Sequence, residues 1–98
     1  MKCENGKCDN DMKIALTIYH YTEIEGEKVW YNKLKDIYSS LDKKTVTRSL
    51  RILSELGFIK GVYGESPNKR PAKLYSPTGE AKALLESYYK KYYKEIKT

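Results

Sequence analysis

Six residues between positions 42 and 51 carry the groups with the clearest chemistry in this sequence. They combine ammonium, guanidinium and hydroxyl side chains within one short segment: Lys43, Lys44, Thr45, Thr47, Arg48 and Arg51. Ammonium and guanidinium groups donate hydrogen bonds to phosphate oxygens, and arginine also pairs with the N7 and O6 atoms of guanine. These residue types are suited to binding a polyanion such as nucleic acid.

A second basic cluster follows in a loop rich in proline and glycine. Lys69, Arg70 and Lys73 lie at or near the tip of this loop. Residues 42–73 hold eight basic and three acidic residues, which is a net charge of +5 out of +6 for the whole chain. A block of this kind focuses positive potential on one side of a molecule. An ordinary solvated face is the alternative, but it usually intersperses its signs.

Other candidates for site chemistry are few. Cys3 and Cys8 are separated by four residues, and His20 is the only histidine. We expect a disulfide between the cysteines, within the chain or between subunits; unpaired thiols and a metal shared by two chains are the alternatives. We expect no metal site and no cofactor, because one chain lacks the four ligands of a structural zinc site. His20 is most simply a structural residue.

The sequence contains no recognisable catalytic set. One histidine does not allow a confident Ser-His-Asp arrangement, and no glycine-rich phosphate loop is present. Glu23, Glu25 and Glu27 alternate around Gly26, a pattern typical of a solvated turn. At 98 residues the chain is one small domain without room for a large substrate pocket. We therefore predict that the protein is not an enzyme.

The segments around these residues predict a mainly α-helical domain with a small β-hairpin. Apolar spacing indicates helices over about 10–23, 31–41, 42–56 and 78–96, a short extended segment at Val29–Trp30, and strands over about 58–63 and 72–76. Asp42 is placed to cap the third helix, and Gly57 is placed to follow its last turn. Val46, Leu50 and Leu53 lie opposite the cationic groups of that helix, so this side faces the core.

This order of elements predicts a winged helix-turn-helix, with a recognition helix over about 42–56 and a wing over about 58–76. The stretch TVTRSLRILSELGFI resembles the recognition helix of MarR- and ArsR-type winged-helix transcriptional regulators, and NKRPAKLYSPT is similar to their wing. The resemblance implies a dimeric regulator of double-stranded DNA. The residues that it places on the DNA are those of the two basic clusters: Lys43, Lys44, Thr47, Arg48, Arg51, Lys69, Arg70 and Lys73.

The resemblance is nearest to a small archaeal or archaeal-virus type of winged-helix protein. Lys, Glu, Tyr and Ile are plentiful and Gln is absent, which is a bias seen in heat-adapted proteins. Neither a membrane span nor a signal peptide is evident, so we expect a cytoplasmic protein, or one of the host cytoplasm if the source is viral.

Apolar and aromatic residues continue along the last helix in one stripe. We expect them to form a dimer interface: Leu84, Leu85, Tyr88, Tyr89, Tyr92, Tyr93 and Ile96. The stripe extends beyond what a small three-helix core can cover, which favours packing against the same helix of a second subunit. Packing within the chain and stacking on nucleic acid bases are the alternatives.

We divide the single structural domain into a flexible segment with the cysteine pair (1–9), a DNA-binding part (10–77) and a dimerisation helix (78–98). Double-stranded DNA and a second copy of the chain are the expected partners, and we expect no membrane or small-molecule ligand. Two other functions remain open: non-specific architectural binding of DNA, and a winged-helix module that binds another protein.

Overall fold

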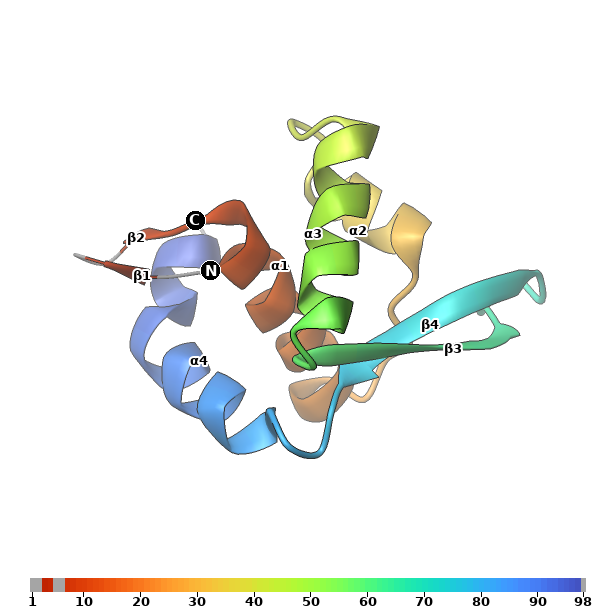
Figure 1. Ribbon diagram of the computed structural model, residues 1–98. Coiled ribbons are helices and arrows are strands. Elements are labelled where there is room, and N and C mark those ends of the chain that lie inside the picture. The colour runs from red at the N-terminus through yellow and green to blue at the C-terminus, as the bar shows by residue number, and fades with distance from the viewer. Residues whose placement is uncertain (1–2, 5–6, 98) are drawn as a thin grey trace.

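The computed structural model of the chain describes residues 3–4 and 7–97, with side chains described for Cys3 and for residues 8–93. Helices form the body, and a long hairpin projects from it (Figure 1). The elements in chain order are β1 Cys3–Glu4, β2 Lys7–Cys8, α1 Asn10–Tyr19, the π-helix η1 His20–Ile24, α2 Tyr31–Ile37, α3 Lys43–Glu55, β3 Ile59–Glu65, β4 Pro71–Pro77 and α4 Lys82–Lys97. The expected sequence of three helices, a hairpin and a last helix is confirmed.

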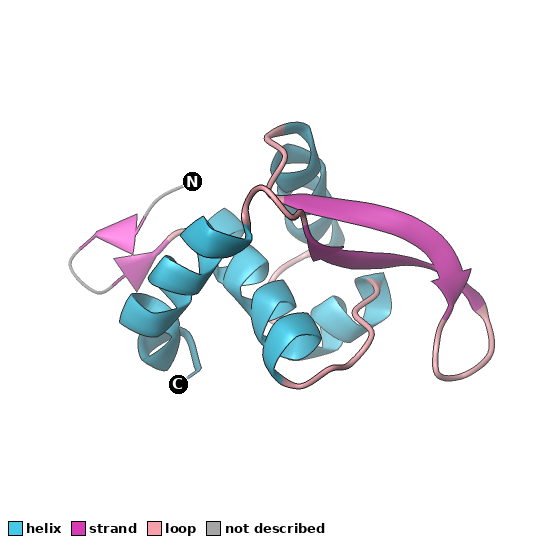
Figure 2. Ribbon diagram, turned by 90° about the horizontal axis from the view of Figure 1, so that it is seen from below, coloured by secondary structure: helices cyan, strands magenta, loops and turns pink. Residues whose placement is uncertain are grey.

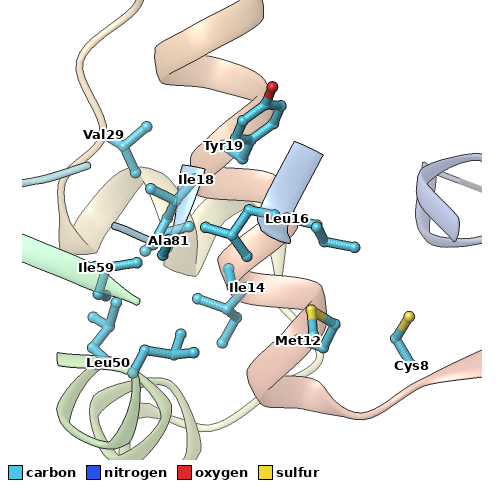
Figure 3. Packing of buried hydrophobic residues seen from close by; sticks show 14 of the residues in the cluster. Cys8, Met12, Ile14, Leu16, Ile18, Tyr19, Val29, Leu50, Ile59 and Ala81 are labelled. Atoms are coloured by element: carbon cyan, nitrogen blue, oxygen red, sulfur yellow. The ribbon is translucent and has the colours of Figure 1, made fainter. Parts of the chain in front are cut away.

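Helix α1 lies at the centre of the core. All of its residues from Ile14 to Tyr19 are buried, so the helix is covered on every side rather than along one stripe. Helices α3 and α4 and strand β4 all pack against it. Figure 3 shows its side chains gathered with Leu50 of α3, Ile59 of β3 and Ala81. None of the helices in the described part of the chain is long and apolar enough to cross a membrane.

Local signals determine both ends of α3. Asp42 is the N-cap, and its carboxylate accepts a hydrogen bond from the backbone amide of Thr45 at 2.7 Å. Gly57 follows the last turn with a φ of +78°, in the left-handed region where a side chain would be strained. The two boundary residues expected from the sequence are therefore confirmed. So is the apolar side of the helix, which is buried: Val46, Leu50 and Leu53.

The segment expected to be extended at Val29–Trp30 is extended at Trp30, with a φ of −133° and a ψ of 172°, but the additional strand expected there does not form. Val29 is buried, and its carbonyl accepts one hydrogen bond from the amide of Tyr75 at 2.8 Å. Trp30 is the N-cap residue of α2, so the chain turns into a helix directly after this contact. A strand pair needs a repeated ladder of hydrogen bonds. The wing sheet therefore has two strands in the described part of the chain, β3 and β4.

The wing is a regular antiparallel hairpin that extends away from the helices (Figure 2). Side chains alternate between the two faces of such a ladder. The register therefore places the central residues Gly61, Tyr63, Lys73 and Tyr75 on the same face. At the tip, the amide of Lys69 donates a hydrogen bond to the carbonyl of Ser66 at 2.8 Å, which closes the turn.

The N-terminal segment contains a second, very short ladder. Strands β1 and β2 pair, and the disulfide expected between Cys3 and Cys8 is present within the chain. Cys8 is buried and belongs to the core cluster (Figure 3). Strand β2 contacts both α4 and α1, so the small ladder packs against the helical body.

Candidate nucleic-acid interface

The outer side of α3 carries the basic groups expected from the sequence. Five side chains on this side are exposed: Lys43, Lys44, Thr47, Arg48 and Arg51. Thr45 is half-buried. Together with Asp42 they line a shallow open hollow of about 620 Å³. Neither Arg48 nor Arg51 forms an ion pair with any residue that the structure describes. Their guanidinium groups can therefore bind an outside anion without first breaking an internal salt bridge.

Asp42 is the one acidic residue of this hollow, and its role is structural. Hydrogen bonds from the hydroxyl and the amide of Thr45 lower the pKa of Asp42, and the charges of Arg48 and Lys35 lower it further. The carboxylate is therefore ionised at neutral pH and continues to cap α3. A capped first turn holds the side chains that follow it in a defined orientation.

A second, smaller hollow, called the groove below, lies between α3 and the wing. Its volume is about 310 Å³, and its lining comes from α2, α3 and β4: Tyr31, Thr47, Leu50, Arg51, Ser54, Glu55, Lys73 and Tyr75. Thr47 and Arg51 line both hollows, so the two are neighbours on the surface. The structure thus brings Lys73 of the wing together with the basic side of α3, although the two are far apart in the sequence.

Lys69 and Arg70 are exposed at the tip of the wing and line neither hollow. The tip lies at the far end of the hairpin from the helices (Figure 1). Lys69 has a φ of +61°, which is uncommon for a residue with a side chain and is adopted here to complete the turn. The two basic clusters of the sequence are therefore one surface near α3 and a separate pair of charges at the end of the wing.

Three tyrosines of this region are not among the site residues expected from the sequence. Tyr31 and Tyr75 line the groove beside α3, and Tyr63 is 81% exposed on the wing. The ammonium nitrogen of Lys73 lies 5.9 Å from the ring centroids of both Tyr63 and Tyr75. The period-two alternation of strands places these wing residues on one face, and this is the signal that would have grouped them.

Helix α4 divides the expected interface residues between two sides. Leu85 is fully buried within the chain. The Nδ1 atom of His20 is 2.7 Å from the hydroxyl of Tyr89, and the His20 ring stacks on Tyr93 with 4.7 Å between centroids. Burial raises the pKa of Tyr93 to about 12, with a further contribution from Tyr21. Leu85 therefore belongs to the intramolecular core and not to a surface, because α1 takes the place that a second subunit was expected to fill.

A row of residues beside Leu85 on α4 is only partly covered. Leu84 is 45% exposed, and Tyr88 and Tyr92 are half-buried with their rings stacked at 5.8 Å between centroids. These three residues follow one another at intervals of four and form one row along the helix, in which Leu84 is exposed while Tyr88 and Tyr92 also pack against the core cluster. The side chain of Ile96, the last residue of the expected stripe, lies outside the part that the structure describes.

The described residues contain no cluster of three or more His, Cys, Asp or Glu side chains that could share a metal ion. His20 is instead enclosed by aromatic rings, with Glu25 at 3.3 Å from its Nε2 atom. Its side chain is 13% exposed, which agrees with a structural role at the junction of η1 and α4.

Comparison with known proteins identifies the fold. No protein-family model matches the chain, and no curated protein matches it. A PadR-like transcription factor from Bacteroides fragilis is similar in structure, with a TM-score of 0.61 and 18% identity over 89% of this chain and 82% of that one. A SlyA-like transcription regulator from Listeria monocytogenes has a TM-score of 0.58 and 21% identity over 95% of this chain.

The chain spans about half the length of the Listeria protein, 54% of it. Similarity at this level of identity shows that the fold is that of winged-helix regulators, as the sequence predicted. Neither neighbour supports an archaeal or viral type, nor a heat-adapted source.

Proposed function

We propose that this protein is a dimeric transcriptional regulator that binds double-stranded DNA. The observation that carries the proposal is the basic surface of α3, with Lys73 of β4 beside it, on a helix whose opposite side is buried in the core. An α-helix with such a face fits the major groove of B-DNA, which is about 12 Å wide. The two similar solved structures are named as a transcription factor and a transcription regulator, not as enzymes, and this supports the same reading.

In the proposed complex, α3 lies in the major groove and the wing contacts the phosphate backbone or the minor groove. Thr47, Arg48 and Lys44 reach base edges, because they lie on the exposed side of the helix near its N-terminal half. Lys69 and Arg70 at the wing tip contact phosphates beyond the major groove. Phosphate contacts position the protein, and base contacts provide the sequence preference.

The partly exposed row of α4 provides the proposed dimer contact. Leu84, Tyr88 and Tyr92 form its stripe, and Leu84 also borders a small hollow of about 170 Å³ whose lining includes Leu56 and Phe58. Leu56 is 57% exposed, so the apolar surface continues from α4 to the end of α3. Burial of these groups against a second copy would remove apolar area from water.

A dimer predicts that the DNA site is an inverted repeat, with half-sites separated by one helical turn of about 34 to 36 Å. The contact is tested by measuring the oligomeric state of Leu84→Asp by sedimentation. Ala83→Asp is the matched control, because Ala83 is also exposed and the substitution adds the same charge to the same helix. We expect only Leu84→Asp to shift the chain toward the monomer. Equal sedimentation of the two variants would contradict the contact.

The function is tested by selecting the duplexes that the protein binds from a random pool. The affinity of the protein for the most enriched duplex is then compared with its affinity for a scrambled duplex at several salt concentrations. We expect an enriched inverted repeat that binds at least ~10³-fold more tightly than the scrambled duplex. Equal affinities and salt slopes would favour architectural binding, and no binding to any duplex would direct the search to a protein partner.

The paired substitution Arg48→Ala with Arg51→Ala tests the role of α3 directly. We expect at least about a tenfold loss of duplex affinity, because good arginine contacts each contribute on the order of 1–3 kcal/mol. Lys90→Ala with Lys91→Ala is the control, because it removes the same charge from exposed positions of α4, outside both hollows and the wing. An equal loss in both variants would mean that net charge, and not the face of α3, drives binding.

A further inference from the structure

The groove between α3 and β4 has the composition of a site for one phosphate group. Arg51 and Lys73 line it from two different elements, and neither forms an ion pair within the described part of the chain. Glu55 also lines it, so these three charges sum to +1, which matches the single negative charge of a phosphodiester. The volume of about 310 Å³ leaves room for a phosphate group.

The position of Lys73 depends on the absence of a side chain at Gly61. A β-carbon at Gly61 would come within 3.0 Å of Cγ and 3.1 Å of Cδ of Lys73, and closer still to its Cε. The lysine stem therefore crosses strand β3 over this glycine. The φ of Gly61 is not in the left-handed region. The backbone does not require glycine at this position, and what is required is space.

Two aromatic rings lie near the ammonium group of Lys73. Tyr63 pairs directly with Lys73 across the ladder, and Tyr75 pairs with Gly61. The ammonium nitrogen is 5.9 Å from each ring centroid, which is within the range of cation–π attraction. The stem over the glycine and the rings beside the ammonium group restrict Lys73 to the face of the wing that borders the groove.

We infer that this groove binds one backbone phosphate of the DNA between Arg51 and Lys73, and that Gly61 is the residue that positions Lys73 for it. The inference rests on the proposed function and adds a specific contact to it. The groove shares Arg51 and Thr47 with the hollow along α3, so a phosphate held here flanks the strand that α3 reads. Preorganisation of the lysine lowers the entropy lost on binding.

The test uses the full chain and a mixed-sequence duplex, with affinity measured by fluorescence anisotropy across a range of salt concentrations. Lys73→Gln removes the charge, Gly61→Ala displaces the lysine while leaving the charge in place, and the double variant combines both. Gly64→Ala is the matched control. It is the same substitution in the same strand, but its β-carbon meets Leu74 on the opposite face of the hairpin.

We expect Lys73→Gln to weaken binding by about threefold to tenfold at low salt and to reduce the magnitude of the salt slope by ~0.9, the value for one phosphate contact. Gly61→Ala should weaken binding in the same direction, and the double variant should be no weaker than Lys73→Gln. Gly64→Ala should bind like the unmodified chain. Glu55→Gln should bind more tightly, because it removes the negative charge from the groove.

Two results would overturn the inference while leaving the proposed function intact. One is an unmodified chain that binds duplexes while Lys73→Gln keeps the same affinity and salt slope. The other is a folded Gly61→Ala variant that binds like Gly64→Ala. If Gly61→Ala does not fold, as judged by its circular dichroism, Lys73→Gln and Glu55→Gln decide the phosphate site. An unmodified chain that binds no duplex at all would overturn the proposed function and the inference together.

Discussion

Replacement of Leu85 by alanine is the most direct test of how α4 packs. Leu85 is fully buried in the cluster that joins α4 to α1. Truncation of a buried leucine costs about 3 kcal/mol, because the transfer energy is lost and a cavity remains. A chain of this length has a total stability of about 5–15 kcal/mol, so the loss is a large fraction of it. At roughly 4–8 °C per kcal/mol, we expect the melting temperature to fall by about 12–24 °C.

The neighbouring Leu84 provides the control, since it is 45% exposed on the same helix. The same substitution there removes about half of a buried leucine, or on the order of 1 kcal/mol, and leaves no enclosed cavity. Urea unfolding followed by circular dichroism measures both variants at several protein concentrations. The reasoning is refuted if Leu85→Ala loses less than about 1 kcal/mol, or if both variants lose the same amount at every concentration.

Three further predictions concern pH and the wing. The pKa of Tyr93 is raised from 10.0 to about 12 in the folded chain. Its contribution to stability should therefore be intact below pH 10 and decrease as the pH rises toward 12, as measured by thermal melts. Tyr93→Phe should reduce this decrease. The pKa of Asp42 is lowered from 3.8, so its cap contributes above pH 3.8 and is lost as the pH falls through the folded-state value; melts of Asp42→Asn in acid should show a smaller change. Lys69→Gly should leave the melting temperature unchanged or raise it, because glycine adopts the φ of +61° without strain. Duplex affinity should fall, because the charge is lost. A clear fall in melting temperature would contradict this prediction.

The elements with strong local signals were predictable from the sequence. Helix α3 begins after the N-cap Asp42 and ends before Gly57, and the structure confirms both. Each end depends on interactions with residues nearby in the sequence. The strands of the wing were also predicted near their observed positions. In contrast, the segment at Val29–Trp30 has the residue types of a strand but makes one hydrogen bond to β4. Residue preference alone could not show that α2 begins too soon for a ladder to form.

The candidate site was predictable in part for a similar reason. Helical periodicity separates the basic side of α3 from its apolar side, so the residues of the larger hollow followed from the sequence. The groove beside it did not, because its lining comes from three elements whose approach depends on the whole core. The link between Gly61 and Lys73 requires the strand register, in which Gly61 faces Tyr75 and Tyr63 faces Lys73.

The sequence by itself determined which residues are basic, which helix carries them, and where that helix begins and ends, since these properties depend on charge, periodicity and local hydrogen bonds. Only the tertiary structure decided which side of α4 is buried. Leu84 and Leu85 are adjacent in the sequence, but Leu85 is fully buried in the core cluster that α4 shares with α1, while Leu84 stays 45% exposed. It also placed Lys73 beside Arg51. Contacts between distant segments depend on the packing of the entire core, which no short stretch of sequence encodes.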